Sequence, residues 1–203
     1  MKVHAFRCSG YFTEEVRKAA ITKARLQSNM IVADVGAGTG FMAAGLAPLV
    51  DQIVVVDGSA AMLETAKKNL SSFKNVSYQV SNGHILPIEN KSIDVAFANM
   101  YLHHCPDPLG AIQEMVRILK PGGRLVITDL EAHPYTWMKE EMADEWMGFD
   151  RSQIKDWFQA AGLSDIDVDC TGQSCCAETS NSSITNEQDR QAKISVFVAT
   201  GVR

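Results

Sequence analysis

The stretch from Ile31 to Gly40, IVADVGAGTG, decides the fold of this chain. Its first half is an apolar run typical of a strand that is covered on both faces of a parallel sheet. The alternating glycines Gly36, Gly38 and Gly40 free the next turn of side chains, so the backbone can bend sharply and a ligand can lie against its N–H groups. Asp34 ends the strand at the sheet edge where open α/β proteins bind ligands. The stretch therefore predicts a nucleoside cofactor site.

The spacing of the glycines bears on which cofactor binds. The dinucleotide fingerprint G-x-G-x-x-G would require a glycine at position 41, where this chain has Phe41. After a helix expected over residues 41–49, a second strand at residues 53–56 is followed by Asp57, whose carboxylate can accept hydrogen bonds from two ribose hydroxyls. Either kind of cofactor would use such an acid. A nucleotide-dependent oxidoreductase therefore stays open as an alternative.

Three later segments add to the pattern D-x-G-x-G-x-G and to the acid after the second strand. They are SNGHILPI at residues 81–88, IDVAFANMYLHHCPDP at 93–108 and LKPGGRLVITD at 119–129. Taken together and in this order, the motifs resemble those of class I S-adenosylmethionine-dependent methyltransferases, and most closely the small-molecule branch with quinone-biosynthesis and metalloid enzymes. The resemblance implies a Rossmann-like α/β fold: a doubly wound, mostly parallel seven-stranded sheet with helices on both faces and an antiparallel last strand.

The resemblance also implies S-adenosylmethionine as cofactor, S-adenosylhomocysteine as product and a small-molecule methyl acceptor. It places the cofactor among Asp34, Gly36, Ala37, Gly38, Thr39, Gly40, Asp57, Gly58, Met62, Asn82, Gly83, His84 and Asn99. One position departs from the family pattern, which usually has an aspartate where this chain has Asn82. An asparagine keeps an acceptor oxygen for the adenine amino group but loses the charge.

Composition limits the other possibilities. The 203 residues suit a single domain, residues 1–203, with 46% apolar residues as in ordinary globular proteins. Its 19 basic and 24 acidic residues give a net charge of −5 and no basic run stands out, so we expect no nucleic-acid partner. No segment is long and apolar enough to cross a bilayer, and the N-terminus lacks a secretory pattern. We therefore expect a cytoplasmic protein without a membrane partner, of open oligomeric state.

Apolar periodicity predicts strands and helices in alternation, as in a mostly parallel sheet. Strands are expected at residues 30–35, 53–56, 76–80, 93–98, 124–130, 164–168 and 193–199. Helices are expected at 13–26, 41–49, 59–70, from Pro108 up to Pro121, and at 152–161. In the helix at 59–70, the spacing suggests an inward face of Ala61, Met62, Thr65 and Ala66.

Two segments lie outside this minimal core, and substrate specificity is expected in them; a third segment is a separate polar stretch. Residues 1–28 form an N-terminal cap that contains the first helix, and residues 131–149 are an insertion that we interpret as a lid. Residues 171–191 are polar and aperiodic, which predicts a long loop. Tyr11 and Trp137 are candidate substrate contacts within the first two segments.

The candidate catalytic residue is His133. Methyl transfer from a sulfonium is an in-line displacement, so the protein supplies alignment and, for a protonated acceptor, a base. His133 follows the fifth strand by a few residues and titrates in a suitable range, although a purely structural role is an open alternative. His103 and His104 stand in the turn after the fourth strand, where the resemblance implies that one histidine packs near the cofactor rather than taking part in the chemistry. No metal is expected at this pair, because no third ligand stands at a recognisable spacing.

Cys170, Cys175 and Cys176 stand in the predicted polar loop, where core packing does not call for cysteine. Three thiolates could bind a soft ion such as arsenite, so a metalloid or thiol methyltransferase is an alternative function. That function requires the three thiols to converge; otherwise they are loop cysteines without a role. A non-catalytic S-adenosylmethionine-binding protein is the remaining alternative.

Overall fold

The computed structural model describes residues 13–81, 85–179, 181 and 190–203, which form a single seven-stranded sheet. Its strands are β1 Ile31–Val35, β2 Gln52–Asp57, β3 Val76–Val80, β4 Ile93–Asn99, β5 Leu119–Leu130, β6 Ser164–Glu178 and β7 Gln191–Val202, in the order β3-β2-β1-β4-β5-β7-β6. The pairs among β1 to β5 are parallel, whereas β7 runs antiparallel to β5 and to β6. The expected architecture, with an antiparallel last strand, is confirmed.

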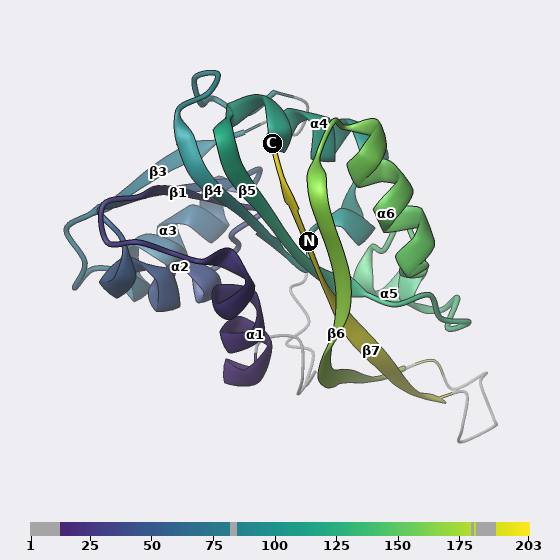
Figure 1. Cartoon of the computed structure of the whole chain (residues 1–203). Helices are drawn as coiled ribbons and strands as arrows, with labels where there is room; N and C mark the ends of the chain where they lie inside the picture. Colours follow the sequence, from purple (N-terminus) through teal and green to yellow (C-terminus); the bar gives the residue numbers. More distant parts are fainter. Residues whose placement is uncertain (1–12, 82–84, 180, 182–189) are drawn as a thin grey trace.

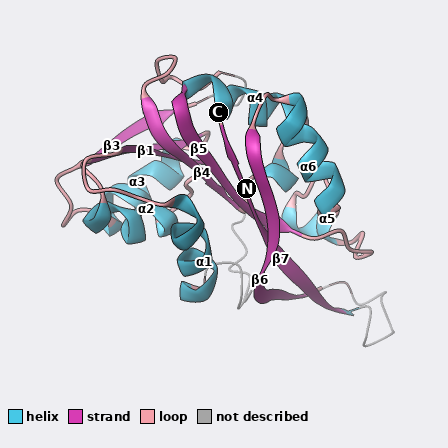
Figure 2. Cartoon of the chain, in the orientation of Figure 1, coloured by secondary structure: helices cyan, strands magenta, loops and turns pink. Residues whose placement is uncertain are grey.

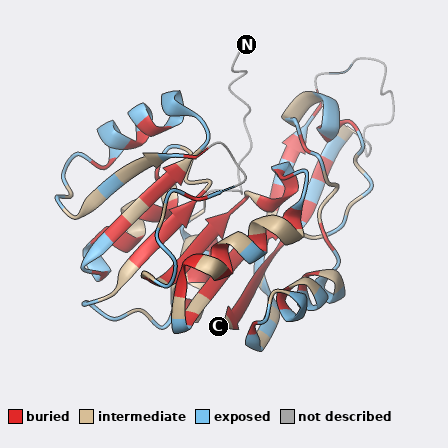
Figure 3. Ribbon diagram, turned by 90° about the horizontal axis from the view of Figure 1, so that it is seen from above, coloured by how far each residue is buried: buried red, intermediate tan, exposed pale blue. Residues whose placement is uncertain are grey.

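Helices cover both faces of the sheet (Figures 1 and 2). They are α1 Glu14–Ala24, α2 Phe41–Leu46, α3 Ala60–Asn69, α4 Pro108–Ile118, α5 Met138–Met142 and α6 Arg151–Ala160, with short 3₁₀ turns η1 Ala47–Leu49 and η2 Leu102–His104. One apolar cluster joins α1, α2 and α3 to the sheet, and another joins α4 and α6 to its opposite face. Figure 3 shows the buried residues concentrated along the central strands. The sheet is thus doubly wound.

The first helix is fixed at its start and near its end. Thr13 caps α1 by accepting a hydrogen bond from the Val16 N–H at 3.3 Å. Near the other end, Lys23 Nζ lies 2.6 Å from Asp167 and 3.2 Å from Asp169 on β6. Residues 14–24 therefore cover the sheet as the predicted N-terminal cap helix, beginning and ending slightly inside the expected bounds.

The buried face of α3 differs from the prediction. Leu63, Ala66 and Leu70 face the core, whereas the expected Ala61, Met62 and Thr65 are exposed. The three buried residues follow the i, i+3, i+7 spacing of one helix face, and the two leucines bury more apolar area than Ala61 and Thr65 would. Met62 instead turns toward the cavity described below.

The predicted polar loop at residues 171–191 is wrong in its first part, because β6 continues through Glu178. The pairing with β7 resumes after an irregularity at Ser174 and Ser195 and runs to Glu178 and Gln191. Buried and exposed residues alternate along this extension, as in a strand with one covered face. Its inward residues are only cysteine and alanine, so the apolar alternation was too weak to recognise. Residues 182–189 lie outside the described part of the chain.

The insertion at residues 131–149 packs against the sheet extension rather than standing free. Trp137 and Met138 share an apolar cluster with Val16 of α1 and with Cys175 and Ile194 of the β6–β7 pair. Its one regular element is the short helix α5, and Glu131 bridges to Phe149 at its base. Whether the insertion moves as a lid stays a prediction. No helix in the described ranges has the length and apolar character needed to span a bilayer.

Candidate functional site

A cavity of about 620 Å³ opens at the carboxyl ends of β1, β2 and β4. The chain continues from β1 to β2 and β3 on one side and returns to β4 on the other side of β1. In open α/β sheets, ligands usually bind at this point, where the strand order reverses. The predicted cofactor residues on its wall are Asp34, Gly36, Ala37, Gly38, Asp57, Gly58, Met62 and Asn99. Thr39 and Gly40 do not line it, and Asn82, Gly83 and His84 lie outside the described residues.

The glycine turn is fixed between β2 and the far wall of the cavity. The N–H groups of Gly36 and Ala37 donate to the Val56 carbonyl at 2.9 and 3.1 Å. Gly36 has a φ of +68°, and a Cβ built there would lie 2.2 Å from the Tyr101 ring. Only glycine fits this close approach. Gly40, with a φ of +85°, N-caps α2 against Leu70, so its role is in packing rather than in lining the cavity.

Asp57 ends β2 with its carboxylate held by two backbone donors. Gly38 N–H donates to Oδ2 at 2.7 Å, and Ser59 N–H donates to Oδ1 at 2.8 Å. An ionised carboxylate has about four acceptor positions, so each oxygen keeps one for a ligand. The side chain is therefore oriented in advance and still able to accept from two hydroxyls.

Asp34 is a buried acid beneath the turn, with 1% of its surface exposed. Its Oδ2 accepts from the Ala43 N–H of α2 at 3.0 Å. Burial raises the pKa of Asp34 to about 7, with a smaller contribution from the charge of Asp57, while the Ala43 hydrogen bond opposes the rise. The cavity floor therefore changes charge near neutral pH.

The wall opposite the glycine turn is built from the last residue of β4 and the residues after it. The sequence analysis named Asn99 and the histidine pair there but missed Met100 and Tyr101. Asn99 accepts a hydrogen bond from Thr128 Oγ1 at 2.6 Å, and Met100 has the unusual φ of +53°. Met100, Tyr101 and His104 all line the cavity. Because these residues follow a parallel strand at its carboxyl end, the sheet-edge rule that singled out Asp57 could have found them.

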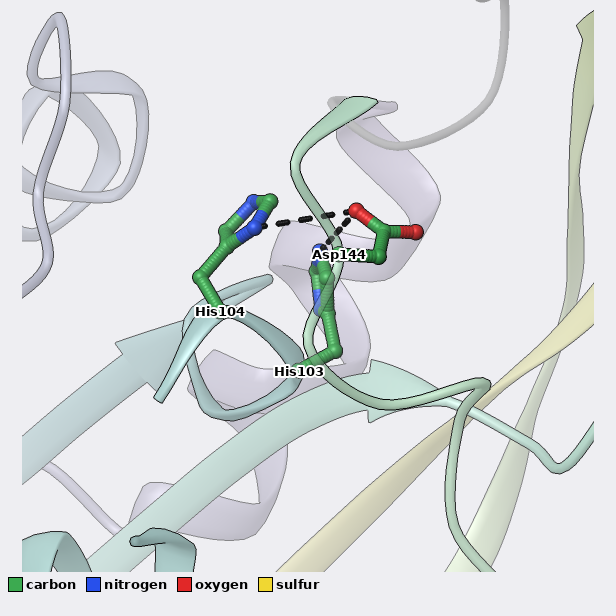
Figure 4. Close-up of side chains that lie close together, drawn as sticks. All are labelled: His103, His104 and Asp144. Carbon is green, nitrogen blue, oxygen red and sulfur yellow. Dashed lines mark ion pairs between the residues drawn. The ribbon is translucent and has the colours of Figure 1, made fainter. Parts of the chain in front are cut away.

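Next to this wall lies a cluster of histidines and aspartates (Figure 4). His103 Nδ1 is 2.6 Å from Asp129 Oδ1 on β5, and both groups are buried. Asp144 from the insertion places Oδ1 3.7 Å from His103 Nε2 and 3.6 Å from His104 Nδ1. Burial lowers the pKa of His103, but the charge and hydrogen bond of Asp129 outweigh it and leave the pKa raised. Burial raises the pKa of Asp129, yet the charge and hydrogen bond of His103 keep this pKa below its usual value.

His133, the predicted base, does not line the cavity. Both of its ring nitrogens are buried without a hydrogen-bond partner among the described residues. Burial, followed by the charge of His103, lowers its pKa to about 4, so the imidazole is neutral at physiological pH. The imidazole is therefore neutral, but a pKa this far below its usual range makes it a weak base, and it does not line the cavity.

The predicted substrate contacts are not brought together around the cavity. Cys170 and Cys176 are exposed while Cys175 is fully buried, and the adjacent Cys175 and Cys176 point to opposite faces of β6. Along β7 their partners are Phe197, Ile194 and Lys193, so Cys170 lies three ladder positions from Cys175, or about 10 Å. The three thiols therefore do not converge, as the metalloid alternative would require. Trp137 is buried in the insertion, and Tyr11 is outside the described residues.

Known proteins are similar to this chain over the region that forms the cavity. A family model described as a methyltransferase domain matches residues 33–127, which include the glycine turn, Asp57 and the wall after β4. The chain is 32% identical over 161 residues to 2-methyl-6-phytyl-1,4-hydroquinone methyltransferase 2, chloroplastic, of Oryza sativa subsp. japonica, covering 77% of this chain and 46% of that protein. Residues 33–127 thus form a methyltransferase domain of the class I S-adenosylmethionine-dependent superfamily.

Other relatives agree with this assignment to the superfamily. Ubiquinone/menaquinone biosynthesis C-methyltransferase UbiE of Coxiella burnetii is 33% identical over 116 residues, which cover 54% of this chain and 46% of UbiE. The chain thus spans about half the length of the curated relatives it matches. The structure of the Bacillus subtilis YcgJ protein superposes with a TM-score of 0.75 at 18% identity, over 94% of this chain and 99% of that one, and supports the fold.

Proposed function

We propose that this chain transfers the methyl group of S-adenosylmethionine to a small-molecule acceptor that carries a hydroquinone-like ring. The observation that carries the proposal is the cavity at the ends of β1, β2 and β4, where the glycine turn faces the pre-oriented carboxylate of Asp57. Both curated relatives described above are named for methyl transfer in quinone or hydroquinone metabolism. Their similarity supports the same acceptor class for this chain.

The residues of the cavity have separate tasks in this proposal. Asp57 accepts the ribose hydroxyls, and the side-chain-free turn at Gly36 and Gly38 lets the cofactor lie against the backbone. The cofactor supplies an activated methyl group on its sulfonium, so the protein needs to align the acceptor and exclude water. Leu86, Met100 and Tyr101 give the cavity apolar and aromatic surface, which suits a flat ring better than a highly charged acceptor.

A phenolic acceptor becomes a better nucleophile when it loses a proton. We propose His133 as the base that receives it, because its nitrogens have no other partner in the described structure. Its pKa of about 4 in this packing makes it a weak base, so the role requires a shift of the insertion that relieves the burial of the ring. Its distance from the cavity wall means that the proton would pass through a water or through a shift of the insertion. His133→Gln should then lower kcat with little effect on cofactor affinity.

The metalloid alternative loses its support in the separation of the three cysteines along β6. Without a converging thiolate set, the chain offers no triple-thiol site for arsenite among its described residues. A turnover assay, rather than a binding assay, distinguishes the non-catalytic alternative from an enzyme.

The test is a turnover assay on the full chain. Purified protein is incubated with S-adenosylmethionine and an alkyl-substituted 1,4-hydroquinone kept reduced, and S-adenosylhomocysteine and the methylated ring are quantified. Product that depends on both reactants and falls strongly in Asp57→Ala supports the proposal. Tight cofactor binding without methylation of hydroquinones or other phenols would favour the non-catalytic reading.

A further inference from the structure

The cluster beside the cofactor cavity contains a third ligand that sequence spacing did not reveal. One side-chain ligand atom from each of His103, His104 and Asp144 lies within 4.8 Å of the other two. Asp144 is 40 positions beyond His104 and comes from the insertion, so only the fold brings it to the histidine pair (Figure 4). The sequence-based expectation of no metal at this pair depended on the lack of such a residue.

His103 presents one specific nitrogen to the cluster. Its Nδ1 is engaged by Asp129 at 2.6 Å, and Asp129 also accepts from the backbone N–H groups of Leu102 at 2.8 Å and Leu130 at 2.7 Å. The ring is thereby fixed with Nε2 facing Asp144. Metal-binding histidines almost always have this arrangement, in which a carboxylate takes the proton of the other ring nitrogen and orients the ring.

Asp144 is a buried carboxylate with an incomplete set of partners. It is 4% exposed, and its Oδ2 has no hydrogen-bond partner among the described residues. The segment that carries it is held in place, because the N–H groups of Glu145 and Trp146 donate to the His103 carbonyl at 2.9 and 3.1 Å. A buried carboxylate oxygen without a partner is costly, and a bound cation would compensate its charge.

The spacing of the cluster suits a shared cation better than direct hydrogen bonds. Asp144 Oδ1 is 3.7 Å from His103 Nε2 and 3.6 Å from His104 Nδ1, beyond the usual range of a hydrogen bond. Ligands about 2.0–2.1 Å from a tetrahedral ion stand roughly 3.4 Å apart. His104 Nδ1 is also 3.2 Å from the Ala143 carbonyl, so this ring must leave that contact, through small side-chain rotations, before it can act as a ligand.

We propose that His103, His104 and Asp144 bind one divalent transition-metal ion at the edge of the cofactor cavity. Two imidazoles and one carboxylate are the donor set of Zn²⁺, Co²⁺, Ni²⁺ and Fe²⁺ rather than of Mg²⁺ or Ca²⁺. Because His104 also lines the cofactor cavity, the ion would be within reach of an oxygen of the methyl acceptor. Metal binding itself does not depend on the proposed methyl transfer, so its tests stand apart from the turnover assay.

The competing explanation is an ion-pair cluster held by protons, in which a protonated His103 faces Asp129 and Asp144. Titration with metal separates the two. Full-length protein, freed of its affinity tag and treated with a chelator, is titrated with Co²⁺ by visible absorption and with Zn²⁺ by calorimetry. We expect one ion per chain, with d–d bands for Co²⁺ and no sulfur-to-cobalt charge-transfer band.

The variants identify the ligands. Asp144→Asn keeps the side-chain volume. His104→Gln changes a side chain that is 45% exposed, so this variant should leave the fold intact. Each should weaken metal binding at least tenfold, whereas the matched control Asp156→Asn, on the exposed side of α6, should not change it. Asp129→Asn, which affects only the orientation of His103, should weaken binding by about 10- to 100-fold.

The outcomes decide the proposal once circular dichroism has shown which variants are folded. Loss of binding in folded His104→Gln, with binding kept in Asp156→Asn, supports the site. Three results would overturn it: no binding at millimolar metal, unchanged binding in the double variant His104→Gln with Asp144→Asn, or a thiolate band that disappears when Cys170 and Cys176 are changed to serine.

Discussion

The backbone N–H of Gly38 donates to Asp57 Oδ2 at 2.7 Å, which ties the glycine turn after β1 to the acid at the end of β2. Two segments that are 19 positions apart in the sequence thus form one preorganised edge of the cavity. Preorganisation of this kind lowers the cost of ordering a site when ligand binds.

Asp57 is therefore expected to dominate recognition of the cofactor ribose. Asp57→Ala should weaken S-adenosylmethionine binding by about 1.5–3 kcal/mol, the range for hydrogen bonds to charged groups. Isothermal titration calorimetry of the parent and the variant measures this difference. Equal affinities would remove Asp57 from the binding site.

Gly36 and Gly38 make a matched pair for testing the turn. Gly36→Ala would place Cβ 2.2 Å from the Tyr101 ring, whereas a Cβ at Gly38 meets nothing within 4 Å, although both residues have positive φ. We expect Gly38→Ala to cost about 1 kcal/mol from backbone conformation, and Gly36→Ala to cost about 1–3 kcal/mol more from the clash. Urea unfolding of both variants gives these values.

The clash itself can be tested by relieving it. If Tyr101 is the obstacle, Gly36→Ala should be less harmful in a Tyr101→Ala background than in the parent, giving a coupling energy in a double-mutant cycle. Simple additivity of the two substitutions would show that the ring is not what requires glycine at position 36.

Asp34 should make stability depend on pH. Burial raises its pKa to about 7 in the folded protein, whereas an ordinary aspartate in the unfolded chain has a pKa of 3.8. Between these two values unfolding releases a proton, so the stability of the fold falls as pH rises. Each pH unit corresponds to about 1.4 kcal/mol, which gives an upper effect on the order of 4 kcal/mol above pH 7. Asp34→Asn keeps an acceptor for the Ala43 N–H and removes the charge.

The measurement is urea unfolding at pH 5 and pH 8. Relative to the parent, Asp34→Asn should gain stability at pH 8, and its stability should fall less between the two pH values. The exposed Asp156→Asn serves as control. Parallel pH profiles for the parent and Asp34→Asn would contradict the assignment of this titration to Asp34.

The lid interpretation of residues 131–149 also makes a prediction. Trp137 and Met138 are buried in the cluster with Val16, so opening would expose the insertion and α1 together. Hydrogen exchange should show that both segments gain protection when cofactor and acceptor bind. Unchanged exchange in both segments would mean that the insertion is a fixed part of the wall.

Local sequence signals were sufficient for the cofactor side of the cavity. The glycine turn and Asp57 are each defined within a few residues of a strand end, and the parallel topology then places them together. The alternation of strands and helices predicted the mostly parallel sheet, whereas the antiparallel last strand was expected from the resemblance to the family. These features depend on short-range patterns, which sequence reasoning captures.

The acceptor side was harder because it depends on contacts between distant segments. Asp144 meets His103 and His104 only after the insertion folds back onto η2, and no spacing rule links positions 104 and 144. The cysteines were misplaced for another reason: a strand of small and polar residues, with Cys175 and Ala177 facing inward, has little of the apolar alternation that marks strands.

The most direct test of the account is a crystal structure of the full chain with S-adenosylhomocysteine. We predict that the nucleoside fills the cavity at the ends of β1 and β2, with both ribose hydroxyls on the Asp57 carboxylate and the ligand backbone against Gly36 and Gly38. A ligand bound elsewhere, or one whose ribose makes no contact with Asp57, would contradict the central claim.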